Sequence, residues 1–152
     1  MDFPKLMEPI QVGHMTWKNR IVMAAMETRL SNPLGDVTRE MCDYYAERAK
    51  GGAAAIIVEN TFVDNIAARS SLSSSGLYSS HLISGKYRLA QAIKANGAAA
   101  LIQLSHGGPK ASSESVPGQT PVAPSPVQFN PGRPVPRELT RDEIVEIEDA
   151  YV

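Results

Sequence analysis

Two segments of the chain are apolar almost throughout, and they limit the possible folds more than any other feature. Residues Ala53–Glu59 (AAAIIVE) and Ala98–Leu104 (AAALIQL) have the length of strands and do not alternate apolar with polar residues. A strand with one solvated face would alternate, so both faces of these strands are expected to be buried. Such strands are typical of parallel sheets that are covered by helices, which predicts an α/β fold.

The segments around these strands carry the period and the end signals of helices. One helix is predicted over Thr38–Lys50, with Thr38 as its N-cap and Gly51-Gly52 as its stop. A second is predicted over His81–Lys94, and Asn96-Gly97 ends it. Strands and helices therefore alternate along the chain, as they do in a parallel α/β sheet.

An earlier strand and two long loops complete this pattern. The strand is predicted over Arg20–Met26 (RIVMAAM), after a hairpin within Ile10–Trp17 that turns at Gly13-His14. The serine-rich stretch Ser70–Ser80 is too polar for a core element and is predicted to be a solvated, functional loop. The proline-rich stretch Gly107–Pro136 is predicted to run over the surface as an extended loop.

A third helix is predicted to begin at Thr140, where Thr140 and Glu143 have the spacing of a capping box. Its apolar stripe continues to Tyr151, and the sequence ends at Val152 without a helix-stop signal. The expectation is one domain over residues 1–152 that contains about three βα units and a leading hairpin and that is truncated in its third helix. A complete (β/α)8 barrel needs about 250 residues.

A barrel is favoured over a doubly wound sheet because the first strand runs into Glu27-Thr28-Arg29 and not into a glycine-rich phosphate loop. The other strands also end in polar groups, at Glu59-Asn60-Thr61 and Gln103-Leu104-Ser105-His106. Chemistry in a barrel gathers at the carboxyl ends of the strands. Glu27 and Glu59 are expected to be carboxylates at this rim that pair with Arg29 or Lys110.

Composition excludes several other classes of function. The 15 Lys and Arg against 16 Asp and Glu give a net charge of -1, which argues against nucleic acid as a partner. The single cysteine, Cys42, permits no intrachain disulfide and no thiolate metal cage, and it suits a cytoplasmic protein. Pro4 and Pro9 interrupt the N-terminus where a signal peptide would be apolar, and no stretch approaches the roughly 20 apolar residues of a membrane span.

Six short motifs occur in a fixed order along the chain. They are Leu6-x-Glu8-Pro9-Ile10, Lys18-Asn19-Arg20-Ile21-Val22-Met23, Tyr44-Tyr45-Ala46-Glu47-Arg48-Ala49, Gln103-Leu104-Ser105-His106, Pro121-Val122-Ala123-Pro124-Ser125 and Pro136-Arg137-Glu138-Leu139-Thr140. Together they resemble the N-terminal part of the old yellow enzyme family, the NADH:flavin oxidoreductases, over essentially the whole chain. The bacterial 2,4-dienoyl-CoA and 2-enoate reductase relatives are more similar than the yeast enzymes.

The resemblance implies the N-terminal portion of a TIM (β/α)8 barrel that holds FMN. In the family, FMN takes a hydride from NAD(P)H and passes it to an activated alkene, so a small-molecule alkene is the implied substrate. By position in the motifs, Ala24, Ala25 and Met26 would line the flavin, Asn60 would approach the same ring, and Gln103 would hydrogen-bond its pyrimidine edge. Fixed polar groups there would stabilise the negative charge of the reduced ring.

The chain also departs from the family. Glu27 stands where relatives have Thr or Cys near the flavin, and His106-Gly107-Gly108-Pro109 replaces the usual His-x-Gly-Arg. The catalytic residues of the family are expected beyond Val152, and one cysteine supplies no iron–sulfur cluster. The chain alone is therefore expected to be inactive. A non-catalytic flavin-binding module and a non-functional remnant remain alternatives, and a homo-oligomer, the alkene and the choice of NADH or NADPH are left open.

Overall fold

The computed structural model describes residues 3–111 and 120–152. Its centre is a four-stranded parallel sheet of β3 (Val22–Met23), β4 (Ala55–Phe62), β5 (Ser75–Gly76) and β6 (Ala99–Ser105). Strand β4 is central: β6 pairs along one of its edges, while β3 pairs with its start and β5 with its end on the other. The predicted parallel α/β sheet is confirmed.

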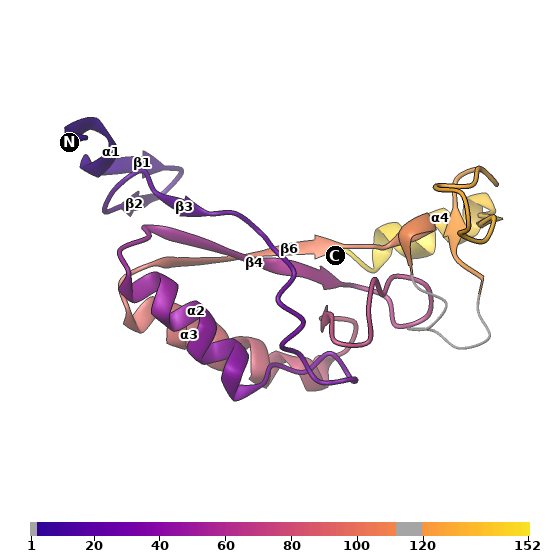
Figure 1. The fold of residues 1–152 in the computed structure, drawn as a ribbon, viewed down its shortest axis with the longest axis horizontal. Coiled ribbons are helices and arrows are strands. Elements are labelled where there is room, and N and C mark those ends of the chain that lie inside the picture. The colour runs from indigo at the N-terminus through magenta and orange to yellow at the C-terminus, as the bar shows by residue number, and fades with distance from the viewer. Residues whose placement is uncertain (1–2, 112–119) are drawn as a thin grey trace.

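Helices α2 (Arg39–Lys50) and α3 (Ile83–Ala95) lie side by side on one face of this sheet (Figure 1). Helix α2 forms as predicted because its ends are capped: the Thr38 hydroxyl accepts the Met41 amide proton, and Gly51 closes α2. A short 3-10 turn, η1 (Ser80–Leu82), precedes α3, so the predicted start at His81 falls within that turn.

The hydrophobic core lies between these helices and β4. Residues of both helices and of the strand are buried together, namely Met41, Tyr45, Ala49, Ile56, Val58, Leu89 and Ile93. The opposite face of the sheet carries neither α2 nor α3 (Figure 1). Burial of the apolar stripes against one face is the main stabilising contribution to this layer, at about 25 cal/mol for each Å² of apolar surface removed from water.

Two predicted strands differ from the structure. The segment Arg20–Met26 is a regular strand only at Val22–Met23, because β4 pairs with it at just two residues. The prediction that Ala98–Leu104 is buried on both faces is wrong, since Ile102 is 37% exposed and Gln103 is also exposed. Strand β6 is an edge of the described sheet and is paired on one side only, which leaves part of its surface open.

The prediction of a solvated loop over Ser70–Ser80 is wrong in its centre. Ser74 and Ser75 have no exposed surface, and Ser75–Gly76 forms β5. These polar residues are buried because they are hydrogen-bonded: the Ser75 hydroxyl accepts from Lys86 Nζ at 2.5 Å. Gly76 is required here, since a Cβ atom would lie 2.7 Å from the Phe62 ring.

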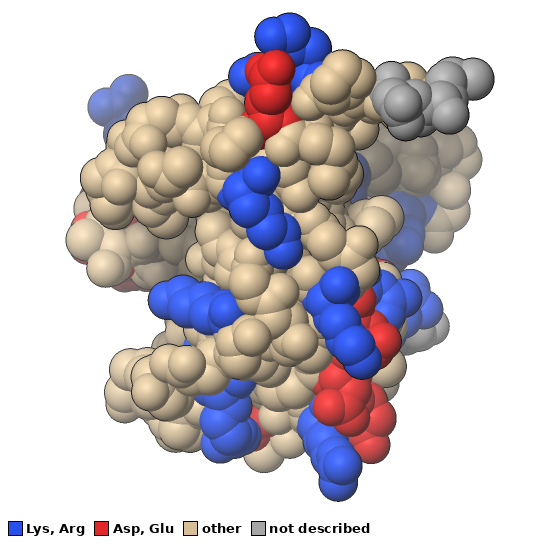
Figure 2. Space-filling model, turned by 90° about the vertical axis from the view of Figure 1, so that its left-hand side faces the viewer, with Lys and Arg blue, Asp and Glu red and all other residues tan. Residues whose placement is uncertain are grey.

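The amino end of the sheet is closed by α1 (Pro4–Met7) and the predicted hairpin of β1 (Ile10–Val12) and β2 (Met15–Trp17), which turns through Gly13 at a φ of 58°. Figure 2 views the molecule from this end. Lys and Arg side chains are spread over this face, and several of them lie beside acidic groups. No described helix has the length and apolarity that crossing a membrane requires, and the longest, α3, has 13 residues.

The carboxyl end of the sheet carries the remaining elements, η2 (Gly108–Lys110), β7 (Val122–Ala123), β8 (Arg137–Glu138) and α4 (Arg141–Asp149). The capping box at Thr140 and Glu143 is confirmed. The predicted extended loop Gly107–Pro136 lies partly outside the described residues, and where described it contains β7, which is buried and pairs with β8.

Candidate functional site

A β-bulge in β4 determines which side chains reach the open face of the sheet. The pairing of β4 with β6 shifts between Val58 and Asn60, so Glu59 is one residue more than β6 can match. Val58 packs against the helices, and the Glu59 carboxylate also reaches α2, where the Tyr45 hydroxyl meets it. Because Glu59 is the extra residue, the side chain of Asn60 lies on the other face of the sheet, which carries neither α2 nor α3.

Asn60 and Gln103 are direct partners in the register of β4 and β6. Paired residues of parallel strands lie on the same face, and Ala100, three residues before Gln103, packs against the helical core. Gln103 therefore lies on the face without helices, towards the carboxyl end of its strand. Its side chain is exposed and that of Asn60 is half-buried.

Ala24, Ala25 and Met26 follow β3, the strand on the other side of β4. They have no regular secondary structure, and Met26 is 54% exposed. The structure thus brings Asn60 and Gln103 together in one register pair and places the Ala24–Met26 segment at the end of a neighbouring strand. The two amide side chains and the small side chains suit a flat heterocycle that offers both donors and acceptors.

Glu27 is bound by the serine-rich loop. Its Oε1 atom accepts hydrogen bonds from Ser70, Ser71 and Ser74 at 3.1, 2.9 and 2.8 Å. Burial acts to raise the pKa of Glu27, but these hydroxyls and the nearby Arg29 guanidinium outweigh it, so the pKa is lowered. The expected ion pair with Arg29 is present at 3.8 Å. The loop therefore holds Glu27 as a carboxylate.

The same loop touches Asn60. Asn60 Nδ2 donates to the Ser70 hydroxyl at 3.2 Å, and Ser70 contacts Ser74 at 2.9 Å. One of the predicted site residues is thus linked through Ser70 to Glu27. This link was not predictable from the sequence, whose only related feature is the density of serine over residues 70–80.

Glu59 is fully buried in a second polar cluster. Its Oε2 atom accepts from the Thr28 amide at 2.7 Å, from the Thr28 hydroxyl and from the Tyr45 hydroxyl at 3.3 Å. Burial raises the pKa of Glu59 more than these donors lower it. The expectation that Glu59 pairs with Arg29 or Lys110 is wrong, because its partners are neutral donors and Lys110 lies over the Phe129 ring.

Lys86 lies in the same layer and was missed at the level of sequence. Burial lowers its pKa to about 8, against the attraction of Glu59 and Asp36. A lysine in the middle of an amphipathic helix is usually solvated, and only the tertiary contact with β5 makes this one different. Glu59 was identifiable in principle, since a carboxylate in an otherwise apolar strand needs buried partners.

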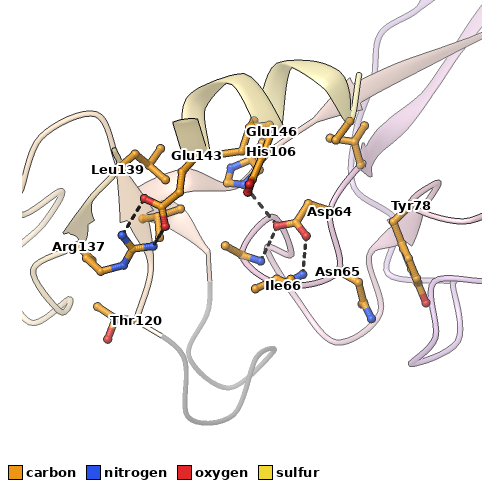
Figure 3. Close-up of a pocket in the computed structure, with 15 residues that line it drawn as sticks. Asp64, Asn65, Ile66, Tyr78, His106, Thr120, Arg137, Leu139, Glu143 and Glu146 are labelled. Carbon is orange, nitrogen blue, oxygen red and sulfur yellow. Dashed lines mark hydrogen bonds and ion pairs between the residues drawn. The ribbon is translucent and has the colours of Figure 1, made fainter. Parts of the chain in front are cut away.

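A cavity of about 650 Å³ lies at the carboxyl end of β4 and β6, between residues 63–67 and α4 (Figure 3). His106 and Asp64 face each other across 3.7 Å in it. Burial would raise the pKa of Asp64, but His106 and two backbone amides, from Ile66 and Ala67, lower it. His106 Nδ1 accepts the Gly108 amide proton, so the ring proton lies on Nε2, which has no hydrogen-bond partner among the described residues.

This arrangement does not suit a metal ion. A protonated Nε2 atom offers no lone pair, and the described residues contain no group of three or more His, Cys, Asp or Glu side chains placed to hold one. The cavity is lined by apolar side chains together with ionisable ones, namely His106, Arg137, Asp64, Glu143 and Glu146. It is separate from the Asn60 and Gln103 pair, which lies on the sheet itself.

Comparisons with known proteins identify relatives along the whole chain. The model of the NADH:flavin oxidoreductase / NADH oxidase family matches residues 5–152. An NADH oxidase from Thermoanaerobacter brockii is 37% identical over 99% of this chain and 23% of its own length. An NADH:acrylate oxidoreductase from Vibrio harveyi is 40% identical over 88% of this chain and 13% of its own length.

Solved structures give the same result for the fold. The old yellow enzyme from Trypanosoma cruzi matches 99% of this chain and 46% of its own length, with a TM-score of 0.88 and 28% identity. The prediction that the three βα units are the N-terminal portion of a (β/α)8 barrel is confirmed by this match. The chain spans less than half of each of these relatives.

Proposed function

Because the chain belongs to the NADH:flavin oxidoreductase / NADH oxidase family, we propose that it forms part of the FMN site of an oxidoreductase. The whole protein would transfer a hydride from NAD(P)H through FMN to an activated alkene of the enoate or dienoyl type. The relatives whose names specify NADH and acrylate support this proposal. Residues 1–152 would belong to one FMN-binding barrel domain.

The register pair of Asn60 and Gln103 carries the proposal. It lies on the sheet face without helices and towards the carboxyl ends of the strands, where barrels place their chemistry. The Ala24–Met26 segment directly follows β3, a neighbouring strand of the same sheet. These residues fit a flavin because they combine two amide side chains with two alanines that let a flat ring approach the backbone.

When bound, FMN would supply the hydride chemistry, and the residues of this chain would bind and orient it. Gln103 would donate to and accept from the pyrimidine edge of the ring. A fixed amide donor at that edge stabilises the negative charge of the reduced ring without reorganisation. Ala24, Ala25 and Met26 would line the ring, and NAD(P)H and the alkene would be bound by further groups of the whole protein.

A flavin titration tests this proposal. Addition of the 152-residue chain is expected to quench FMN fluorescence, and Gln103→Ala is expected to weaken binding of oxidised FMN about fivefold, the effect of one neutral hydrogen bond. Gln91→Ala is the matched control, because Gln91 is exposed on α3. Absence of quenching at tens of micromolar chain, or equal affinities of the two variants, would contradict the assigned site.

We also propose that the 152-residue chain by itself does not catalyse alkene reduction. Its edge strand β6 is open, and the chain spans 23% and 13% of the two relatives compared above. In the same preparation, NAD(P)H with an enoate is expected to remain unoxidised even where FMN binds. Steady oxidation coupled to alkene reduction would overturn this part of the proposal.

A further inference from the structure

Glu27, Ser70 and Asn60 form a chain of hydrogen bonds that ends at the proposed flavin face. We propose that Glu27 and Ser70 are positioning residues that hold the Asn60 amide with its nitrogen towards the serine loop and its carbonyl oxygen towards the cofactor. This inference rests on the proposed FMN site. It assigns a role to the serine-rich loop and to Glu27, where this chain departs from the family pattern.

Glu27 determines which group donates and which accepts in each of these hydrogen bonds. Three serine hydroxyls converge on its Oε1 atom, and the Arg29 guanidinium lies 3.8 Å from its Oε2 atom. These contacts favour the ionised form, in keeping with the lowered pKa of Glu27. An ionised carboxylate accepts hydrogen bonds and donates none. In any hydrogen bond between Glu27 and one of these serines, the serine therefore supplies the proton.

Ser70 in turn determines which atom of Asn60 it can contact. A hydroxyl has one proton, and that of Ser70 is directed to Glu27 at 3.1 Å or to Ser74 at 2.9 Å, which itself donates to Glu27. In either case the Ser70 oxygen offers Asn60 only lone pairs. Asn60 must therefore turn its Nδ2 atom to Ser70, as the 3.2 Å contact has it.

The orientation of the Asn60 side chain matters because its Oδ1 and Nδ2 atoms are similar in size, while one accepts hydrogen bonds and the other donates them. The orientation of an asparagine is decided by its hydrogen-bond network, and here an acceptor-only carboxylate at the start of the network decides it. With Nδ2 directed to Ser70, the oxygen is left as the group for a ligand on the open face. An acceptor matches ring N–H groups, and a flavin carries more of them when reduced than when oxidised.

The structure therefore predicts that Asn60 favours reduced FMN. Loss of the Ser70 hydroxyl frees the Asn60 amide to rotate. Ser70→Ala is therefore expected to weaken the binding of reduced FMN about fivefold more than the binding of oxidised FMN, which is the effect of one neutral hydrogen bond. Both affinities are measurable by anaerobic calorimetry, with FMN oxidised or reduced by dithionite. Ser73→Ala is the matched control in the same loop, and Ser70→Thr, which keeps the hydroxyl, is expected to restore the wild-type ratio.

A double-mutant cycle separates positioning from a general effect on folding. If Ser70 acts through Asn60, Ser70→Ala changes the ratio of the two affinities in the wild type and leaves it unchanged in the Asn60→Ala background. An equal change in both backgrounds, or an unchanged ratio in the single variant, would overturn the inference. If the wild type binds neither form of FMN, the proposed function itself fails, so the two failures are distinguishable.

Discussion

The phenol of Tyr45 is predicted to be a main support of the buried cluster around Glu59. Its oxygen accepts the backbone amide proton of Glu59 at 2.9 Å and donates to the Glu59 carboxylate at 3.3 Å. Both tyrosine and glutamate are fully buried. Tyr45→Phe keeps the ring and its packing and removes only the hydroxyl, so its effect isolates these two interactions.

The magnitude follows from the groups that lose a partner. A buried backbone N–H without an acceptor costs about 1–3 kcal/mol, and loss of the longer bond to the carboxylate adds about 1 kcal/mol. Tyr45→Phe is therefore expected to lower the free energy of unfolding by about 2–4 kcal/mol. This is a large part of the roughly 5–15 kcal/mol that stabilises an ordinary domain.

Urea unfolding and amide hydrogen exchange measure this loss. The midpoint is expected to fall without a change in m, and the Glu59 amide is expected to exchange faster. Tyr44→Phe is the matched control: its ring packs against Tyr45 and under Arg48, contacts that phenylalanine keeps, so it should stay within about 0.5 kcal/mol of the wild type. Equal midpoints and equal Glu59 exchange in the two variants would refute the reasoning.

Two further predictions concern protons. Burial lowers the pKa of Lys86 to about 8 in the folded chain, from 10.5 for an exposed lysine. Between these pH values the folded chain binds fewer protons than the unfolded chain. The free energy of unfolding should therefore rise from pH 8 towards pH 10, by up to about 1.4 kcal/mol per pH unit. In urea unfolding, Lys86→Met should lose this rise while Lys94→Met, exposed on the same helix, keeps it; a rise that survives in Lys86→Met refutes the assignment. Neutral His106 should carry its proton on Nε2, because Nδ1 accepts from Gly108, and nitrogen NMR shifts that place the proton on Nδ1 would contradict the geometry.

The parts of the fold that sequence predicts are those decided locally. Helix α2 begins at Thr38 and α4 at Thr140 because a hydroxyl caps the first turn, and both signals need only neighbouring residues. The hairpin at Gly13 is local in the same way. The burial of a polar residue by partners far away in the sequence cannot be predicted from such local signals. Ser75 is polar by composition and becomes part of the sheet only because β4 and Lys86 satisfy it.

The candidate site shows where periodicity misleads. Ile56 and Val58 face the helices, so strict alternation would place Asn60 with them and turn Glu59 to the open face. The bulge reverses both, and Glu59 Oε2 accepts hydrogen bonds from Thr28 and Tyr45 on the helical side of the sheet. Asn60 reaches the partner position of Gln103 only as a consequence. The buried cluster and the open face are therefore linked, because the bulge that turns Glu59 towards the helices also sets which amide faces the proposed cofactor.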